Sequence, residues 1–140
     1  MNRLKLDPEA LGLSTILERI AGVQVKDCFK DDTGETIYYV VETGQLGKAL
    51  GKGGINVKRI QEHFTKRIRI IEYRNEVISF VKNVIYPAQV EEVVQENNEI
   101  LIKDSSRKTK SLLIGRGGKN LKLINRAVKR FFNINEVKII

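Results

Sequence analysis

Leu50-Gly51-Lys52-Gly53-Gly54 returns later in the chain as Ile114-Gly115-Arg116-Gly117-Gly118, at an offset of 64 residues. The likeness continues beyond the glycines, because Asn56 meets Asn120 at the same offset. A chance glycine-rich match would not carry the following segment along with it. The chain is therefore expected to hold two copies of one unit, each about 65–70 residues long, near the lower size for an independently stable core.

Apolar periodicity and turn residues predict the same order of elements in both copies: helix, strand, strand, short helix, glycine loop, helix, strand. In the first copy we expect helices at 14–20, 44–50 and 56–66, and strands at 23–29, 36–41 and 67–73. In the second copy we expect helices at 76–84, 109–114 and 120–132, and strands at 89–94, 100–103 and 137–140. Ser14 is predicted to cap the first helix, since serine is favoured at the N-cap. Val23, Val25 and Phe29 are predicted to share one face of the first strand.

Size and composition agree with two small domains. The chain has 140 residues, of which 41% are hydrophobic and 30% charged, as is typical of a globular protein. The expected fold class is α+β. The first domain is expected to span residues 1–74 and the second residues 75–140.

The chain is basic, and its charge is unevenly spread. Lys and Arg total 25 and Asp and Glu total 17, which gives a net charge of +8. Residues 1–73 carry 12 basic and 10 acidic groups, whereas residues 74–140 carry 13 and 7. Between Lys103 and Arg130 ten residues are basic and one is acidic. This balance points to a polyanionic partner, with nucleic acid first and an anionic membrane surface second.

A Gly-x-x-Gly turn between two helices can bind phosphate. Glycine permits positive φ and lets a ligand approach the backbone, and the N-terminus of the next helix favours an anion. Lys52 and Arg116 add a full positive charge inside the two loops. A plain helix–helix connection would look similar for one loop. Two copies, each with a central cation, favour a sugar-phosphate backbone lying across each loop. The basic residues on the helices beside the loops would extend this contact, and they are Lys58, Lys66, Lys119, Lys122, Arg126 and Lys129.

Other functional classes fit the sequence less well. One histidine, His63, and one cysteine, Cys28, supply no zinc set and no nucleophile–base pair, so we expect no catalytic residues and no metal. Neither loop has the strand-to-helix context of a P-loop or a dinucleotide fingerprint, so no cofactor and no small-molecule substrate are expected. The chain is predicted not to be an enzyme. No apolar run has the length of a membrane span or a signal peptide, so we expect a cytoplasmic protein without a membrane partner.

The segments 49–60 and 113–121 resemble the signature of a KH domain, an aliphatic residue and a Gly-x-x-Gly loop followed by an amphipathic helix. The helix-first, strand-last order is similar to the type II arrangement. This resemblance implies two tandem type II KH domains, each a three-stranded sheet with helices packed on one face. It also implies single-stranded RNA as the partner, bound in a groove beside each loop. The implied RNA-binding residues are Gly51, Lys52, Gly53, Gly54, Lys58, Gly115, Arg116, Gly117, Gly118, Lys119 and Lys122.

The nearly linker-free tandem resembles the NusA-type pair of KH domains, and a pair of this size is similar to archaeal NusA-like proteins. That resemblance implies a role in transcription termination or antitermination, with RNA polymerase as a further candidate partner. Two alternatives stay open. One is a ribosome-associated or RNA-processing KH protein, and the other is a KH-fold scaffold that binds proteins.

Overall fold

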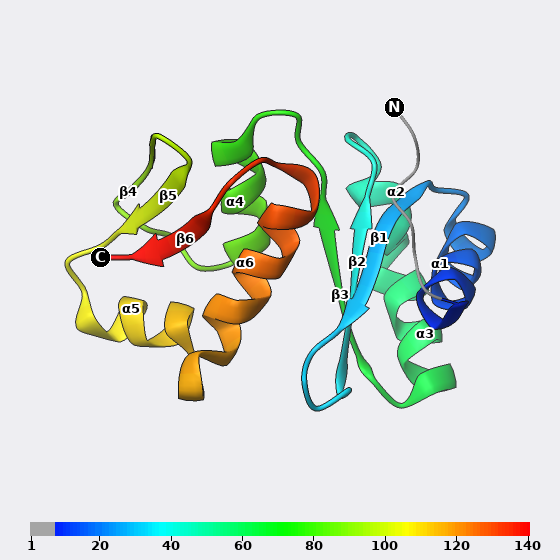
Figure 1. Ribbon diagram of the computed structural model, residues 1–140. Coiled ribbons are helices and arrows are strands. Elements are labelled where there is room, and N and C mark those ends of the chain that lie inside the picture. The colour runs from blue at the N-terminus through cyan, green and yellow to red at the C-terminus, as the bar shows by residue number, and fades with distance from the viewer. Residues whose placement is uncertain (1–7) are drawn as a thin grey trace. The chain divides into compact units, whose positions relative to one another are not determined.

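The computed structural model describes residues 8–140 and divides between Tyr73 and Arg74 into two compact units, each with its own three-stranded sheet (Figure 1). The first unit contains α1 (Pro8–Ala21), β1 (Val25–Lys30), β2 (Thr36–Val41), α2 (Leu46–Leu50), a 3₁₀ turn η1 (Lys52–Gly54), α3 (Ile55–Phe64) and β3 (Arg67–Glu72). The second contains α4 (Val77–Ile85), β4 (Glu92–Glu96), β5 (Glu99–Lys103), α5 (Arg107–Ile114), η2 (Arg116–Gly118), α6 (Lys119–Phe131) and β6 (Glu136–Ile139). Both units follow the predicted order of elements.

The sheet topology is the same in the two units. β1 and β2 pair antiparallel and β2 and β3 pair parallel, as do β4 with β5 and β5 with β6. A parallel pair needs a crossover connection, which in each unit is the short helix, the glycine loop and the longer helix. The loop therefore lies inside the crossover, held between two helices. The α+β class with two tandem type II KH folds is confirmed.

The core of the first unit lies between one face of its sheet and the helices α1, α2 and α3 (Figure 1). Leu17 of α1, Tyr39 of β2 and Ile60 of α3 are fully buried in it. Ala49 of α2 is also fully buried, so this five-residue helix is fixed by packing rather than by its length. The position of the first glycine loop follows from that anchor.

The first helix is longer than predicted, and Ser14 is not its N-cap. α1 begins at Pro8, whose fixed φ suits the first helical position. Ser14 is buried within the helix, where its Oγ donates a hydrogen bond to the carbonyl oxygen of Ala10 at 2.8 Å. Serine can satisfy its hydroxyl in this way inside a helix. The prediction was wrong because a serine N-cap and a back-bonded serine look alike in sequence.

The first strand departs from simple alternation. The pairing of β1 with β2 shifts register between Val25 and Asp27. Beyond this bulge Cys28 joins the core together with Val25, whereas Phe29 stacks on Tyr38 with ring centroids 5.1 Å apart. The prediction that Phe29 shares a face with Val25 was therefore wrong, since an extra residue in one strand reverses the faces that follow it.

The second unit has its own apolar core. Phe80 and Val81 of α4, Ile100 and Ile102 of β5 and Val128 of α6 are fully buried. β4 begins later than predicted, at Glu92 rather than residue 89. Asp104 explains the shift, because its Oδ2 accepts a hydrogen bond from the Glu91 backbone N–H at 3.2 Å. The residue just before β4 is therefore hydrogen-bonded to a side chain and not to the backbone of a neighbouring strand.

Candidate nucleic-acid interface

The first glycine loop is a tight turn of defined backbone geometry. α2 ends at Leu50, and Gly51 follows as its C-cap. Gly51 has φ 76° and ψ 170°, a region that is essentially open to glycine alone. Gly53 and Gly54 follow with φ of 65° and 73°, and the Gly54 N–H donates to the Gly51 carbonyl oxygen at 3.0 Å. α3 then starts at once, at Ile55. The turn thus leads the chain directly into the N-terminus of a helix, whose first N–H groups have no partner within it.

The second loop has almost the same geometry. Gly115 has φ 75° and ψ 170°, and Gly117 and Gly118 have φ of 65° and 79°. The Gly118 N–H donates to the Gly115 carbonyl oxygen at 3.1 Å. Two segments 64 residues apart thus adopt one backbone shape, so the sequence repeat is also a structural repeat of the site.

Close contact with an asparagine explains why the first glycine of each loop has no side chain. A Cβ on Gly51 would lie 2.8 Å from Asn56 Nδ2, and a Cβ on Gly115 would lie 2.8 Å from Asn120 Cγ. Both distances are shorter than real Cβ contacts. By contrast, a Cβ on Gly53 would meet no atom within 4 Å. The inner side of the turn is therefore packed, while its outer side is open to a ligand.

The same two asparagines form a hydrogen bond across each loop. Asn56 Nδ2 donates to the carbonyl oxygen of Lys48 at 3.2 Å, and Asn120 Nδ2 donates to that of Leu112 at 2.8 Å. In each unit the hydrogen bond joins the start of the longer helix to the end of the shorter one, across the glycines. Sequence reasoning did not assign these residues to the site. Their match at the 64-residue offset was the signal that could have found them.

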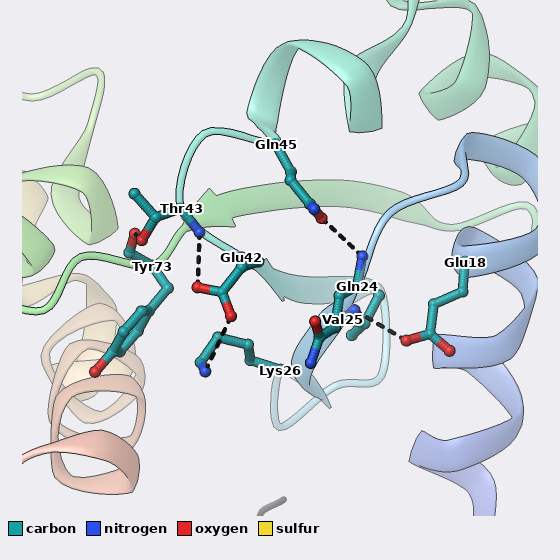
Figure 2. A network of polar contacts seen from close by, with 8 residues as sticks. All are labelled: Glu18, Gln24, Val25, Lys26, Glu42, Thr43, Gln45 and Tyr73. Atoms are coloured by element: carbon teal, nitrogen blue, oxygen red, sulfur yellow. Dashed lines mark hydrogen bonds and ion pairs between the residues drawn. The ribbon is translucent and has the colours of Figure 1, made fainter. Parts of the chain in front are cut away.

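Polar contacts also fix the chain before α2 (Figure 2). Gln45, at the N-cap position of α2, accepts a hydrogen bond through Oε1 from the Gln24 backbone N–H at 2.7 Å. Next to it, Glu18 Oε2 of α1 accepts from the Val25 N–H at 3.0 Å. These bonds link α1, β1 and the start of α2, so the helix that carries the first loop is positioned at both ends.

The predicted cations lie at or near the loop tips. Lys52 and Arg116 are exposed, and neither has an ion-pair partner among residues 8–140. Lys58 is exposed on the first turns of α3. Lys119 is half-buried at the start of α6, and Lys122 is exposed one turn later. Each unit therefore brings its own glycine turn and its own predicted cations together on one helix N-terminus.

The single histidine and the single cysteine lie apart from the glycine loops, at positions 63 and 28. Within residues 8–140 no group of three His, Cys, Asp or Glu side chains could hold a metal ion. His63 packs edge-on against Phe64, with ring centroids 4.7 Å apart. Cys28 is buried in the core of the first unit, as expected for a small apolar side chain. None of the helices in this described part of the chain is long and apolar enough to cross a membrane.

Comparison with known proteins agrees with this fold. Residues 13–75 match the KH domain family. The chain is 33% identical to a probable transcription termination protein NusA of Methanocaldococcus jannaschii, over 100% of this chain and 77% of that protein. It is 25% identical to the protein of the same name in Thermoplasma acidophilum, over 99% and 97% of the two chains. The solved crystal structure of APE1850 superposes with a TM-score of 0.75 at 29% identity, over 96% of this chain and 100% of that one. A relative with this identity and coverage shows the family, and the chain belongs to the archaeal NusA-like proteins built from KH domains.

Proposed function

We propose that this protein binds single-stranded RNA through both glycine loops and acts in transcription termination or antitermination. The observation that carries the proposal is the doubled site: two turns with matching φ and ψ, each with an exposed cation at its tip. The name of several relatives, probable transcription termination protein NusA, supports the cellular role.

The site residues in this proposal divide by role. Gly51 and Gly115 allow the turn to close over the asparagine beneath it. Gly53, Gly54, Gly117 and Gly118 leave open space in which a phosphate can approach the backbone. Lys52 and Arg116 attract that phosphate, and the start of the next helix offers N–H donors to it. Lys58, Lys119 and Lys122 contact neighbouring phosphates.

Fluorescence anisotropy tests the proposal, with labelled single-stranded RNA, duplex RNA and single-stranded DNA at two salt concentrations. We expect single-stranded RNA to bind best and its affinity to fall with salt, because phosphate contacts release counterions. The variant Lys52→Asp, Gly53→Asp, Arg116→Asp, Gly117→Asp should lose binding while remaining folded, at a cost of no more than about 1–2 kcal/mol of unfolding free energy for each glycine replaced. Aspartate tolerates the positive φ of Gly53 and Gly117 better than most residues do.

A charge-matched pair separates the loops from net charge. Lys52→Ala with Arg116→Ala removes two positive charges at the loop tips, and Lys82→Ala with Lys138→Ala removes two from α4 and β6. The first pair should weaken RNA binding about tenfold or more, and the second by about threefold or less. Equal losses, or a wild-type protein without preference for single-stranded RNA, would overturn the assignment.

RNA polymerase is the second partner in this proposal. The role named for the relatives acts on transcription, so the protein should be retained by immobilised polymerase. A pull-down with purified polymerase, before and after ribonuclease treatment, tests this. Retention that survives the nuclease supports direct contact, and retention that disappears leaves RNA as the only bridge and refutes direct contact.

A further inference from the structure

The two loops share one backbone shape but lie in different electrostatic surroundings. On α6 four cations follow a spacing of three, four and three residues: Lys119, Lys122, Arg126 and Lys129. That spacing places them on one side of a helix. The buried residues Ile124 and Val128 lie on the opposite side. Lys122, Arg126 and Lys129 are exposed, so the stripe faces solvent from the loop to the last turns of the helix.

The stripe is absent from the matching helix of the first unit. At the 64-residue offset the four cations of α6 correspond to Ile55, Lys58, Glu62 and Thr65. These four positions carry one positive and one negative charge, against four positive charges on α6. Ile55, Glu62 and Thr65 are exposed, so the difference lies on the surface rather than in the core.

The contrast extends over the whole crossover. Residues 107–131, from the start of α5 to the end of α6, contain nine basic residues and no acidic one. The matching residues 43–67 contain six basic residues and one acidic one. Neither Lys122 nor Lys129 has an ion-pair partner within residues 8–140, so their charge is not neutralised by an acidic side chain there.

We propose that the second unit is the anchoring site for RNA, and that the α6 stripe holds the sugar-phosphate backbone as it leaves the second loop. The stripe spans residues 119–129, so its ends lie ten steps of 1.5 Å, about 15 Å, apart along the helix, long enough to follow several phosphates. The first loop is the weaker subsite, because the matching positions of the first unit offer one cation where the stripe offers four. This inference rests on the proposed function. It adds that the second loop contributes more to RNA affinity than the first.

Separate disruption of the loops tests that order in the full-length protein. Lys52→Asp with Gly53→Asp alters the first loop, and Arg116→Asp with Gly117→Asp makes the same change in charge in the second. The probe is a labelled single-stranded RNA long enough to reach both loops. The second-loop variant should lose affinity by about tenfold more than the first-loop variant.

The stripe is tested by removing two charges from either helix. Lys122→Gln with Lys129→Gln neutralises half of the stripe, and Lys58→Gln with Arg59→Gln removes the same charge from exposed positions of α3. The slope of log affinity against log salt should become shallower by about 1.4 for the α6 pair, that is roughly 0.7 per lost phosphate contact on a single strand. The α3 pair should change the slope by less than about half of that amount.

A gain-of-function variant gives the most direct test of the stripe. Glu62→Arg on α3 and Thr65→Lys at the C-cap that follows it copy the last two stripe positions into the first unit, both at exposed sites. Affinity should rise, and disruption of the first loop should then cost more than it does in the wild type. Asp32→Arg with Glu35→Gln makes the same charge change in the exposed turn between β1 and β2 and controls for net charge. A similar rise in both variants overturns the stripe.

The outcomes separate the two proposals. If the wild type binds no single-stranded RNA, the proposed function fails and the anchoring site fails with it. If the wild type binds RNA but the two loop variants lose equal affinity, the proposed function stands and the anchoring site is refuted. A larger loss from the second loop, together with the shallower salt slope, supports both.

Discussion

Asn125 pairs its side-chain amide with both backbone groups of Val137. Its Oδ1 accepts from the Val137 N–H at 2.8 Å, and its Nδ2 donates to the Val137 carbonyl oxygen at 3.1 Å. The same Nδ2 lies 3.0 Å from the carbonyl oxygen of Leu121. These hydrogen bonds connect the middle of α6 to β6. At the 64-residue offset stands Gln61, whose Oε1 accepts from the Ile68 N–H of β3 at a longer 3.4 Å.

Replacing Asn125 should therefore destabilise the protein more than replacing Gln61. Asn125→Ala removes two hydrogen bonds from a partly buried strand and should lower the free energy of unfolding by about 2–3 kcal/mol. Gln61→Ala removes one long hydrogen bond and should cost less than about 1 kcal/mol. Urea unfolding followed by circular dichroism measures both. Equal costs would show that the Asn125 pairing adds nothing to the packing of α6.

The asparagine beneath each loop gives a second matched comparison. Asn56 is only 8% exposed, so Asn56→Ala removes the donor to the Lys48 carbonyl from a partly buried hydrogen bond and should cost about 1–2 kcal/mol of unfolding free energy. Asn120 is exposed, and water can replace its bond to Leu112, so Asn120→Ala should cost under about 1 kcal/mol. Asn133→Ala, at another exposed position, is the control and should be nearly neutral. Urea midpoints in the reverse order would contradict the closing role of Asn56.

Alanine at the first and third loop positions should separate the two reasons for glycine. Gly51→Ala meets both a forbidden backbone region and Asn56, and should destabilise the protein by about 3 kcal/mol. Gly53→Ala has open space for its Cβ and adds only the strain of a left-handed residue, about 1–2 kcal/mol. Thermal unfolding at fixed pH compares the two. A Gly53 variant as unstable as the Gly51 variant would show that the outer side of the loop is packed after all.

The repeat made most of the fold predictable. Matching segments at one offset gave the order of elements and both glycine turns, because a crossover of two helices and a glycine loop joins the parallel strands in each copy. What the sequence did not reveal depended on pairing between segments. The bulge after Val25 arises from how β1 aligns with β2, and no single-strand pattern records it. The prediction for Ser14 failed for a related reason, since the hydroxyl finds its acceptor inside the helix.

The site was predictable in its loops but not in its supports. Lys52 and Arg116 stood out because each glycine loop has a cation at the same position. Asn56 and Asn120 matched in sequence, yet their role appears only when Nδ2 is seen to bond across the loop. Pro8, followed by Glu9, was a signal for an earlier start of α1 that sequence reasoning did not use.

Tyr39 should make the stability of the protein sensitive to alkaline pH. Its ring is fully buried, and its hydroxyl donates a hydrogen bond to the Leu13 carbonyl oxygen at 3.0 Å. Burial raises the pKa of Tyr39 well above its ordinary value of 10, and neighbouring Cys28 adds to the shift. Because the folded-state pKa is raised, the unfolded chain loses this proton first. The contribution of Tyr39 to stability is therefore complete below about pH 10 and declines as pH rises beyond it.

Tyr39→Phe removes the hydrogen bond and the titrating group together. At pH 7 the variant should be less stable by about 1 kcal/mol, the usual value of one hydrogen bond. Urea unfolding of both proteins at several pH values from 7 to about 11 should show the wild-type advantage shrinking above about pH 10. Tyr86→Phe is the control, since Tyr86 is 68% exposed. A wild-type advantage that stays constant to pH 11 would mean that Tyr39 releases its proton as easily in the folded protein as in the unfolded chain.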